Sequence, residues 1–173
     1  MKKTISLLVS LLLVLALLAA CGAERSYTLE AAADLEAAVR QSDVVLTATP
    51  SYAPLIRAEW VRPGTHLSCI GADMGGKQEI ASAIFRNAVV VCDDRTHCME
   101  AGEMELPLRE GVIQASDIRC EIGKLILGRA KGRENEEQIT IYDACGMALL
   151  DIACAKAALE LAEQNNIGQI VEI

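Results

Sequence analysis

Short apolar runs alternate with helical patterns along most of the chain. Four runs predict strands, and they span residues 43–47, 65–70, 88–92 and 138–142. The run 88–92 is apolar at every position, which is typical of a strand that is covered on both faces. Strands that alternate with helices at this spacing predict a parallel sheet in an α/β layer.

Helical patterns fill most of the intervals between these strands. Thr28 is a good N-cap for a helix that reaches about Gln41, and Glu30 would lie in its first turn, where the helix dipole favours an anion. The alanine-rich segment 146–164 predicts a long apolar helix. Further helical segments are expected over 57–60, 77–86, 94–100 and 117–127, and a short final strand over 168–173.

The beginning of the chain has the pattern of a lipoprotein export signal. Two lysines at positions 2–3 precede an uncharged apolar stretch, which ends Leu-Ala-Ala directly before Cys21. The apolar run is shorter than the ~20 residues that a spanning helix needs. We therefore predict a signal peptide over 1–20, a lipid on Cys21 that attaches the protein to the cell membrane, and a linker over 21–27. A chance apolar helix and an uncleaved anchor are the alternatives.

Length and charge narrow the possible functions. The 173 residues are enough for one hydrophobic core rather than two. The chain has 24 acidic and 16 basic residues, which gives a net charge of −8. Such a surface repels nucleic acid, and the sequence has no basic cluster with aromatic residues to offset it. We therefore expect no nucleic-acid partner.

Six cysteines follow Cys21, and their placement disagrees with export. Cys69 and Cys92 lie in strand-like runs, which is typical of buried thiols in a reduced protein. Exported proteins usually have few cysteines or paired ones. The segment from Cys92 to Cys98 also contains an imidazole and two carboxylates, but no second ligand pair at zinc spacing follows it. We therefore expect no metal site, and a disulfide between these two cysteines only if the domain is exported.

A Gly-rich phosphate turn is missing from the sequence. A dinucleotide-binding fold needs G-x-G-x-x-G after its first strand, where the backbone approaches the pyrophosphate at a helix N-terminus. The segment 123–128 has the outer glycine spacing of a P-loop, but Arg129 and Ala130 replace the required Lys and Ser/Thr. We therefore predict an incomplete Rossmann-like parallel sheet over 28–145, without its first β-α-β unit, and a C-terminal helix and strand over 146–173.

Several sequence blocks, in order and at plausible spacing, carry a family resemblance. They are Ser42–Ser51, Trp60–His66, Ile70–Glu79, Val91–Arg95, Glu121–Gly123, Gly132–Arg133, Thr140–Asp143, Gly146–Ala148 and Asp151. Together they resemble the later half of the ornithine cyclodeaminase/mu-crystallin family, from about Leu29 onward. The N-terminal substrate and dimer domain of that family has no counterpart in this sequence.

The resemblance implies NAD-dependent chemistry on a small amino-acid substrate. In ornithine cyclodeaminases, a hydride leaves the substrate Cα for the nicotinamide and gives an imine. The side-chain amine closes on this imine, ammonia leaves, and the hydride returns to yield proline. Relatives reduce keto or imino acids instead. The resemblance therefore implies a lyase or an oxidoreductase with NAD as its cofactor.

Asp73, in Gly71-Ala72-Asp73, matches the catalytic aspartate of the family. A carboxylate beside the substrate amine binds its charge and moves protons, and a loop at the end of a strand is the expected place for a ligand crevice. A turn or a helix cap is the alternative for an isolated aspartate. Residues on the cofactor side of the family site match Thr47, Ala48, Thr49, Pro50, Gly71, Lys77 and Asp143.

We expect the chain by itself to be inactive and to form oligomers. Binding of a substrate carboxylate would need basic residues from the missing domain, and no replacement is evident in the sequence. The strand over 44–47 lacks its outer neighbour, so an open sheet edge invites pairing. A non-catalytic membrane-anchored lipoprotein, a binding remnant, or a signal joined to a truncated enzyme are the alternatives.

Overall fold

The computed structural model describes residues 28–169. The chain divides into two units, Met1–Ala33 and Asp34–Ile173, and all of the described elements belong to the second. In chain order these are α2 (Leu35–Gln41), β1 (Val44–Thr47), β2 (Tyr52–Ile56), the 3-10 helix η1 (Ala58–Trp60), β3 (His66–Cys69), β4 (Gln78–Ile80), η2 (Ser82–Asn87), β5 (Val89–Cys92), α3 (Arg95–Ala101), α4 (Glu105–Arg109), η3 (Ala115–Asp117), β6 (Ile118–Glu121), α5 (Ile122–Ile126), β7 (Thr140–Asp143) and α6 (Ala148–Gln164).

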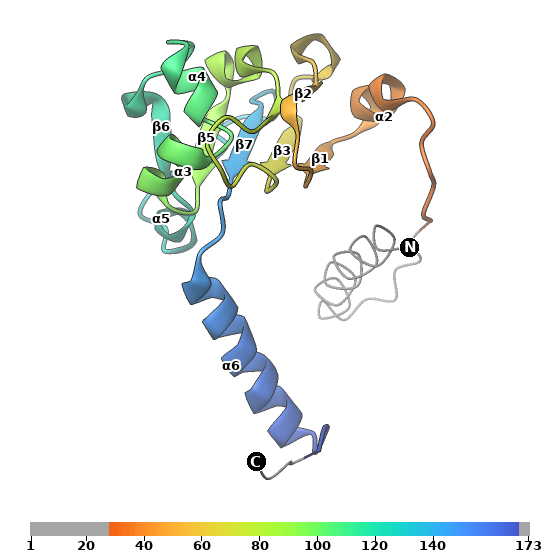
Figure 1. Cartoon of the computed structure of the whole chain (residues 1–173), viewed down its shortest axis with the longest axis vertical. Coiled ribbons are helices and arrows are strands. Elements are labelled where there is room, and N and C mark those ends of the chain that lie inside the picture. Colours follow the sequence, from red (N-terminus) through yellow and green to blue (C-terminus); the bar gives the residue numbers. More distant parts are fainter. Residues whose placement is uncertain (1–27, 170–173) are drawn as a thin grey trace. The chain divides into compact units, whose positions relative to one another are not determined.

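Five strands form a parallel sheet in the order β1-β3-β7-β5-β6 (Figure 1). Leu67 of β3 lies opposite Val45 on one side and Ile141 on the other, and Ile141 in turn faces Val90 of β5. A separate parallel pair joins β2 to β4. The predicted α/β class and the parallel sheet are therefore confirmed. Because all five strands point the same way, the loops that follow them meet along one edge of the sheet.

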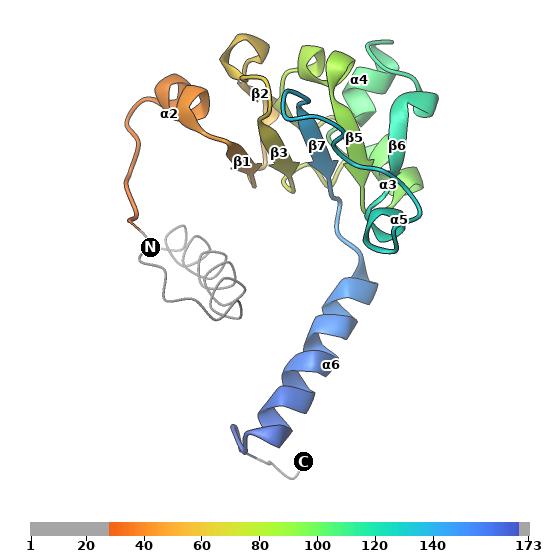
Figure 2. The same cartoon turned by 180° about the vertical axis from the view of Figure 1, so that it is seen from behind.

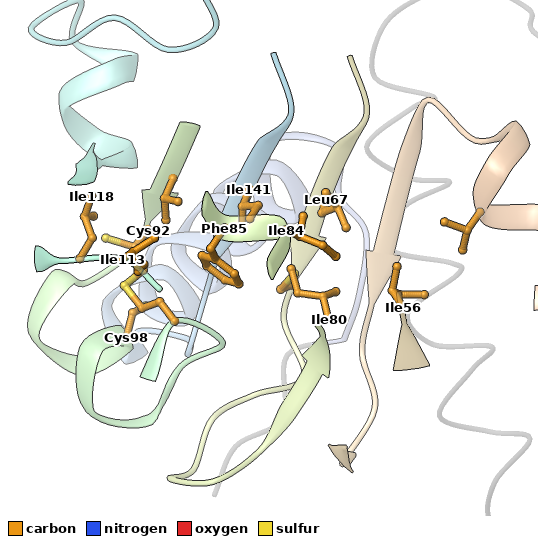
Figure 3. Packing of buried hydrophobic residues seen from close by; sticks show 14 residues of the cluster. Ile56, Leu67, Ile80, Ile84, Phe85, Cys92, Cys98, Ile113, Ile118 and Ile141 are labelled. Atoms are coloured by element: carbon orange, nitrogen blue, oxygen red, sulfur yellow. The ribbon is translucent and has the colours of Figure 1, made fainter. Parts of the chain in front are cut away.

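The two faces of the sheet are covered unequally. On the first face, Leu67, Val90 and Ile141 pack against Phe85 of η2 and Cys98 of α3 in the main core (Figure 3). On the second face, a smaller cluster joins Val89, Val91 and Cys120 to the short helix α5, which follows β6 in Figure 2. The strand β5 is buried at every position, as its uniformly apolar sequence predicted.

The helix predicted over 77–86 is wrong. Its first part forms β4, which pairs with β2, and its second part forms the 3-10 helix η2. The backbone N–H groups of Glu79 and Ile80 donate to the buried carboxylate of Glu103, at 2.8 and 2.7 Å, instead of to carbonyls of a helix. A tertiary contact has thus overridden the local helical preference.

The helix predicted over 117–127 is correct only in its second half. Ile118–Glu121 form β6, which pairs with β5, and the helix is limited to α5. The side chains of Ile118 and Cys120 are both buried, and pairing beside β5 is what buries them. The sequence pattern also did not indicate β2, whose Pro54 is unusual within a strand.

The predicted helix start at Thr28 is wrong as well. Residues 28–33 contain no helix, and α2 begins after Asp34, whose carboxylate accepts a hydrogen bond from Ala37 N at 3.1 Å. Asp34 therefore provides the N-cap that was assigned to Thr28. The predicted acidic first turn is provided by Glu36, which also pairs with Arg40.

The long C-terminal helix is confirmed as α6. Its apolar residues are exposed, with Leu149 at 70%, Ile152 at 66% and Leu159 at 61%. No helix within residues 28–169 is both long and apolar enough to cross a membrane. The predicted signal peptide over 1–20, the lipidated Cys21 and the linker over 21–27 lie outside the described residues, as does most of the final strand over 168–173.

Candidate functional site

The loops after β1 and β3 lie side by side at the carboxyl edge of the sheet. Thr47 and Cys69 are opposite each other in the register, so the segments that follow both strands leave the sheet together. Gly71 approaches Thr49 so closely that a Cβ atom on it would lie 2.5 Å from the Thr49 backbone nitrogen. The structure thus brings together the predicted cofactor-side loop Thr47-Ala48-Thr49-Pro50 and the predicted Gly71.

A buried carboxylate holds these two loops in place. Glu79 Oε1 accepts the N–H of Thr49 at 2.5 Å, and Oε2 accepts the N–H of Gly71 at 3.0 Å. Glu79 is fully buried, so it has no competing water at its surface. Carboxylates that accept backbone N–H groups form stronger hydrogen bonds than neutral acceptors do. Glu79 therefore fixes the spacing of the two loops, a role that its sequence position in the family-like block did not reveal.

Asp73 is the exposed carboxylate of this edge. Its side chain is 54% exposed, and it forms an ion pair with Lys77, whose side chain is only 12% exposed. The hydrogen bond from Lys77 lowers the pKa of Asp73, and the same contact raises the pKa of Lys77. Asp73 is therefore ionised at neutral pH and already faces a cation. A cationic amine could replace Lys77 as its partner.

A second buried carboxylate supports the first. Glu103 Oε1 accepts the N–H groups of Glu79 and Ile80, while Glu103 Oε2 has no hydrogen-bond partner within the described residues. Burial raises the pKa of Glu103 to about 7, although the two N–H groups oppose this shift. Glu103 thus holds Glu79 in place, and Glu79 in turn holds the two loops.

Asp143 extends the series to a third buried carboxylate. Its Oδ1 and Oδ2 atoms accept the N–H groups of Glu103 and Met104, at 3.0 and 2.9 Å, and it is fully buried. Burial raises the pKa of Asp143 well above the usual range. The contact of this side chain with a cofactor remains a prediction. Gly102 allows the close packing, because a Cβ atom there would lie 2.7 Å from Asp143 Oδ2.

Glu79, Glu103 and Asp143 together make the carboxyl edge of the sheet rigid. Each accepts two backbone N–H groups. Glu103 accepts the N–H of Glu79, and Asp143 accepts the N–H of Glu103. The sequence pattern could not reveal this series, because its members lie 24 and 40 residues apart along the chain. The result is a fixed frame from which Asp73 projects toward solvent.

The residues present fit only part of a site for NAD. The loops after β1 and β3 form one wall at the edge where cofactors bind in open α/β sheets. A diphosphate needs free backbone N–H groups, but those of Thr49 and Gly71 already donate to Glu79. The described residues therefore fit the end of the cofactor that meets the substrate, with Asp73 beside it, and not the diphosphate.

Hollows on the described surface include one at the predicted site and one away from it. One of about 300 Å³ is lined by Thr47, Ala48 and Thr49 together with apolar residues of α2 and β1. The other, of about 490 Å³, lies over the second face of the sheet and is lined by none of the predicted site residues. The first hollow thus coincides with the predicted cofactor-side loop.

The two histidines of the chain lie in different surroundings. His66 lies in β3, where its Nδ1 atom is 2.7 Å from Thr140 Oγ1. Burial lowers the pKa of His66. His97 is exposed on α3. Neither ring contacts Asp73 by a hydrogen bond or an ion pair in the part of the chain that the structure describes.

Comparison with known proteins identifies a family and relatives that are similar to this chain. The model of the "Ornithine cyclodeaminase/mu-crystallin family" matches residues 17–166. The alanine dehydrogenase of Archaeoglobus fulgidus is 42% identical over 130 residues, which are 75% of this chain and 40% of that protein.

Solved structures share the fold. An archaeal alanine dehydrogenase dimer with bound NAD superposes with a TM-score of 0.73 at 41% identity, over 81% of this chain and 43% of that one. The Delta(1)-pyrroline-2-carboxylate reductase of Thermococcus litoralis, in complex with NADH and L-proline, gives a TM-score of 0.74 at 30% identity, over 80% and 43%. The chain therefore spans less than half the length of these relatives.

Proposed function

The chain belongs to the ornithine cyclodeaminase/mu-crystallin family, and from this premise we propose that it supplies the catalytic carboxylate and one cofactor-facing wall of an NAD-dependent oxidoreductase for a small amino or imino acid. One observation carries the proposal. Asp73, an exposed and ionised carboxylate, follows two residues after Gly71, which packs against Thr49 of the loop Thr47–Pro50 at the carboxyl edge of a parallel sheet. NAD, when bound, supplies or accepts the hydride at the substrate Cα.

Asp73 has two tasks in this proposal. As a carboxylate it binds the ammonium group of an amino acid, in exchange for its contact with Lys77. When the amine loses its protons on the way to an imine, the same carboxylate accepts one of them, and it returns the proton in the reverse direction. Glu79 keeps the loop of Asp73 at a fixed distance from the loop Thr47–Pro50, and correct spacing of reacting groups is itself a large part of catalysis.

We further propose that residues 28–173 do not turn over substrate by themselves. Two observations support this statement. The N–H groups of Thr49 and Gly71 are engaged by Glu79, and the sequence contains no Gly-rich turn to hold a diphosphate.

A chimeric enzyme tests the proposal. The part of the Archaeoglobus fulgidus alanine dehydrogenase that precedes the matched segment is joined to residues 28–173 of this chain. We expect NAD-dependent oxidation of a small amino acid, followed by NADH absorbance. The Asp73→Asn variant should lower kcat by about 10²- to 10⁴-fold, the range for loss of a general acid–base group.

Asp43→Asn serves as the matched control, because Asp43 is an exposed carboxylate whose side chain is 95% exposed and which lies at the other end of β1. A chimera that folds and binds NADH but keeps its full activity when it carries Asp73→Asn would contradict the role of Asp73. A folded chimera that binds no NADH would contradict the cofactor wall and would favour the non-catalytic membrane-anchored lipoprotein indicated by residues 1–21.

A further inference from the structure

Three thiols from distant parts of the chain meet beside the end of β5. Cys92 is the last residue of β5, Cys98 lies on α3, and Cys145 follows β7. Cys98 Sγ donates to Asp93 Oδ1 and Asp143 O, while Cys92 Sγ donates to the carbonyl oxygen of Cys120 and Cys145 Sγ to that of Ala72. Cys92 and Cys98 lie at one end of the main core (Figure 3). Cys98 is fully buried, whereas Cys145 is half-buried and so closer to solvent.

The carboxylate of Asp143 completes a compact group of donor atoms. Cys98 Sγ, Cys145 Sγ and a carboxylate oxygen of Asp143 all lie within 4.8 Å of one another. In a tetrahedral zinc site with Zn–S bonds of about 2.3 Å and Zn–O bonds of about 2.0–2.2 Å, ligand atoms are about 3.5–3.8 Å apart. Small side-chain rotations would therefore bring these three atoms to ligand distance.

The buried acidic groups around this cluster have no basic partner among the described residues. Asp93, Glu103 and Asp143 are all buried there, and in residues 28–169 no Lys, Arg or His forms an ion pair with any of them. Cys98 Sγ lies 3.0 Å from Asp93 Oδ1 and 3.4 Å from the carbonyl oxygen of Asp143. One S–H group cannot donate fully to both. Buried charges in proteins are generally paired or bound to a metal ion.

We propose that Cys98, Asp143 and Cys145 form a zinc-binding site. Thiolate sulfur and carboxylate oxygen are both common ligands of Zn²⁺, and thiolates select it over harder cations such as Mg²⁺. Binding releases the protons of the two thiols to solvent. A fourth ligand is at hand in Asp93, whose Oδ1 atom contacts Cys98 and whose Oδ2 atom accepts the N–H of Gly146 at 2.8 Å.

The site would have a structural rather than a catalytic role. It joins α3 to the segment after β7, two parts of the chain that are 45 residues apart. It adjoins the edge at Asp73, because Cys145 Sγ lies 3.6 Å from the carbonyl oxygen of Ala72, but none of its proposed ligands belongs to the loops after β1 and β3. Spacing along the sequence did not indicate the site, since Asp143 and Cys145 come from the end of β7, far along the chain from Cys98 on α3.

Cobalt and zinc titrations of the full-length chain test this proposal. The protein is kept reduced with a phosphine, stripped with a chelator and titrated with Co²⁺. We expect thiolate-to-cobalt charge-transfer absorption that saturates at one ion per chain, and loss of this absorption when Zn²⁺ is added. Zn²⁺ should also raise the midpoint of thermal unfolding, because it binds the folded chain only. Absence of the charge-transfer band would overturn the proposal.

Cysteine variants locate the ion. Cys145→Ser should abolish both the absorption and the thermal shift, whereas Cys154→Ser, at an exposed cysteine of α6, and Cys120→Ser, on the second face of the sheet, should retain both. Retention of the band in Cys145→Ser would overturn the proposal.

Alkylation of the unmodified chain provides a test that requires no variant. With mass-spectrometric detection, Zn²⁺ should slow the reaction of Cys145 and leave that of Cys154 unchanged. Equal rates at Cys145 with and without Zn²⁺ would also reject the site.

Discussion

Gly71 shows how a single residue determines the shape of the candidate site. Its backbone N–H donates to Glu79, and its Cα faces Thr49 with no room for a side chain. The sequence analysis identified Gly71 through its family-like block, and the structure adds the physical reason. Only a residue without a Cβ atom allows the loops after β1 and β3 to share one buried carboxylate.

Gly71→Ala should therefore destabilise the protein by about 1–3 kcal/mol, the range for an overpacked buried position. The added Cβ atom would lie 2.5 Å from both Thr49 N and Glu79 Oε1, so the loops would have to separate. The free energy of unfolding is measured by urea denaturation.

Gly123→Ala is the matched control for this measurement, because a Cβ atom there meets no atom within 4 Å and the residue lies in α5. It should be neutral or stabilising by up to about 1 kcal/mol, since Ala is the better helix former. Equal stability of the two variants would mean that the loops do not make the close contact described.

At the scale of elements, the sequence predicted strands better than helices. The runs around β1, β3, β5 and β7 are apolar enough that burial in a parallel sheet was their simplest interpretation, and all four strands are confirmed. The segments 77–86 and 117–127 have helical periodicity, yet each contains a strand. Partners elsewhere in the chain decide both cases, namely Glu103 with β2 for the first and β5 for the second.

The candidate site was likewise predicted only in part. Asp73, Gly71 and the loop Thr47–Pro50 were identified through motif resemblance, and the structure brings the two loops together. The roles of Glu79 and Glu103 were not predicted. A buried carboxylate can be recognised as a holder of loops only when its distant N–H partners are known, and sequence spacing contains no such information.

The start of α2 gives a direct test at the element scale. Asp34→Ala should destabilise the protein by about 1 kcal/mol, because it removes the acceptor for Ala37 N at the helix N-terminus. Thr28→Ala should have no effect, although Thr28 was the N-cap that the sequence pattern favoured. Thermal unfolding followed by circular dichroism measures both variants. If Thr28→Ala destabilised the protein more than Asp34→Ala, the helix would begin at Thr28, as the sequence pattern predicted.

At the scale of the whole molecule, the described residues place no strand beyond β1 at its edge of the sheet. β1 is the terminal strand of the five, and Val44 and Leu46 are 63% and 55% exposed. The carbonyl oxygens of Asp43 and Thr47 accept N–H groups from the β3 side. Because alternate residues of a strand bond to the same neighbour, the N–H groups of Val44 and Leu46 face outward. An edge of this kind is a template for another strand.

We therefore expect the chain to self-associate through β1, and Val44→Pro should shift the sedimentation profile toward smaller species. Proline at the first position of a strand removes an outward N–H group and leaves the bonds to β3 intact. Val44→Thr is the control, because it changes the side chain and retains the N–H group.

Ile152→Glu tests the competing explanation, in which the exposed apolar residues of α6 drive association. Sedimentation velocity is measured for each variant over a range of protein concentrations. If Val44→Pro sediments like the parent chain while Ile152→Glu dissociates, the contact lies on α6. The open edge of β1 would then have no part in assembly, despite its outward N–H groups.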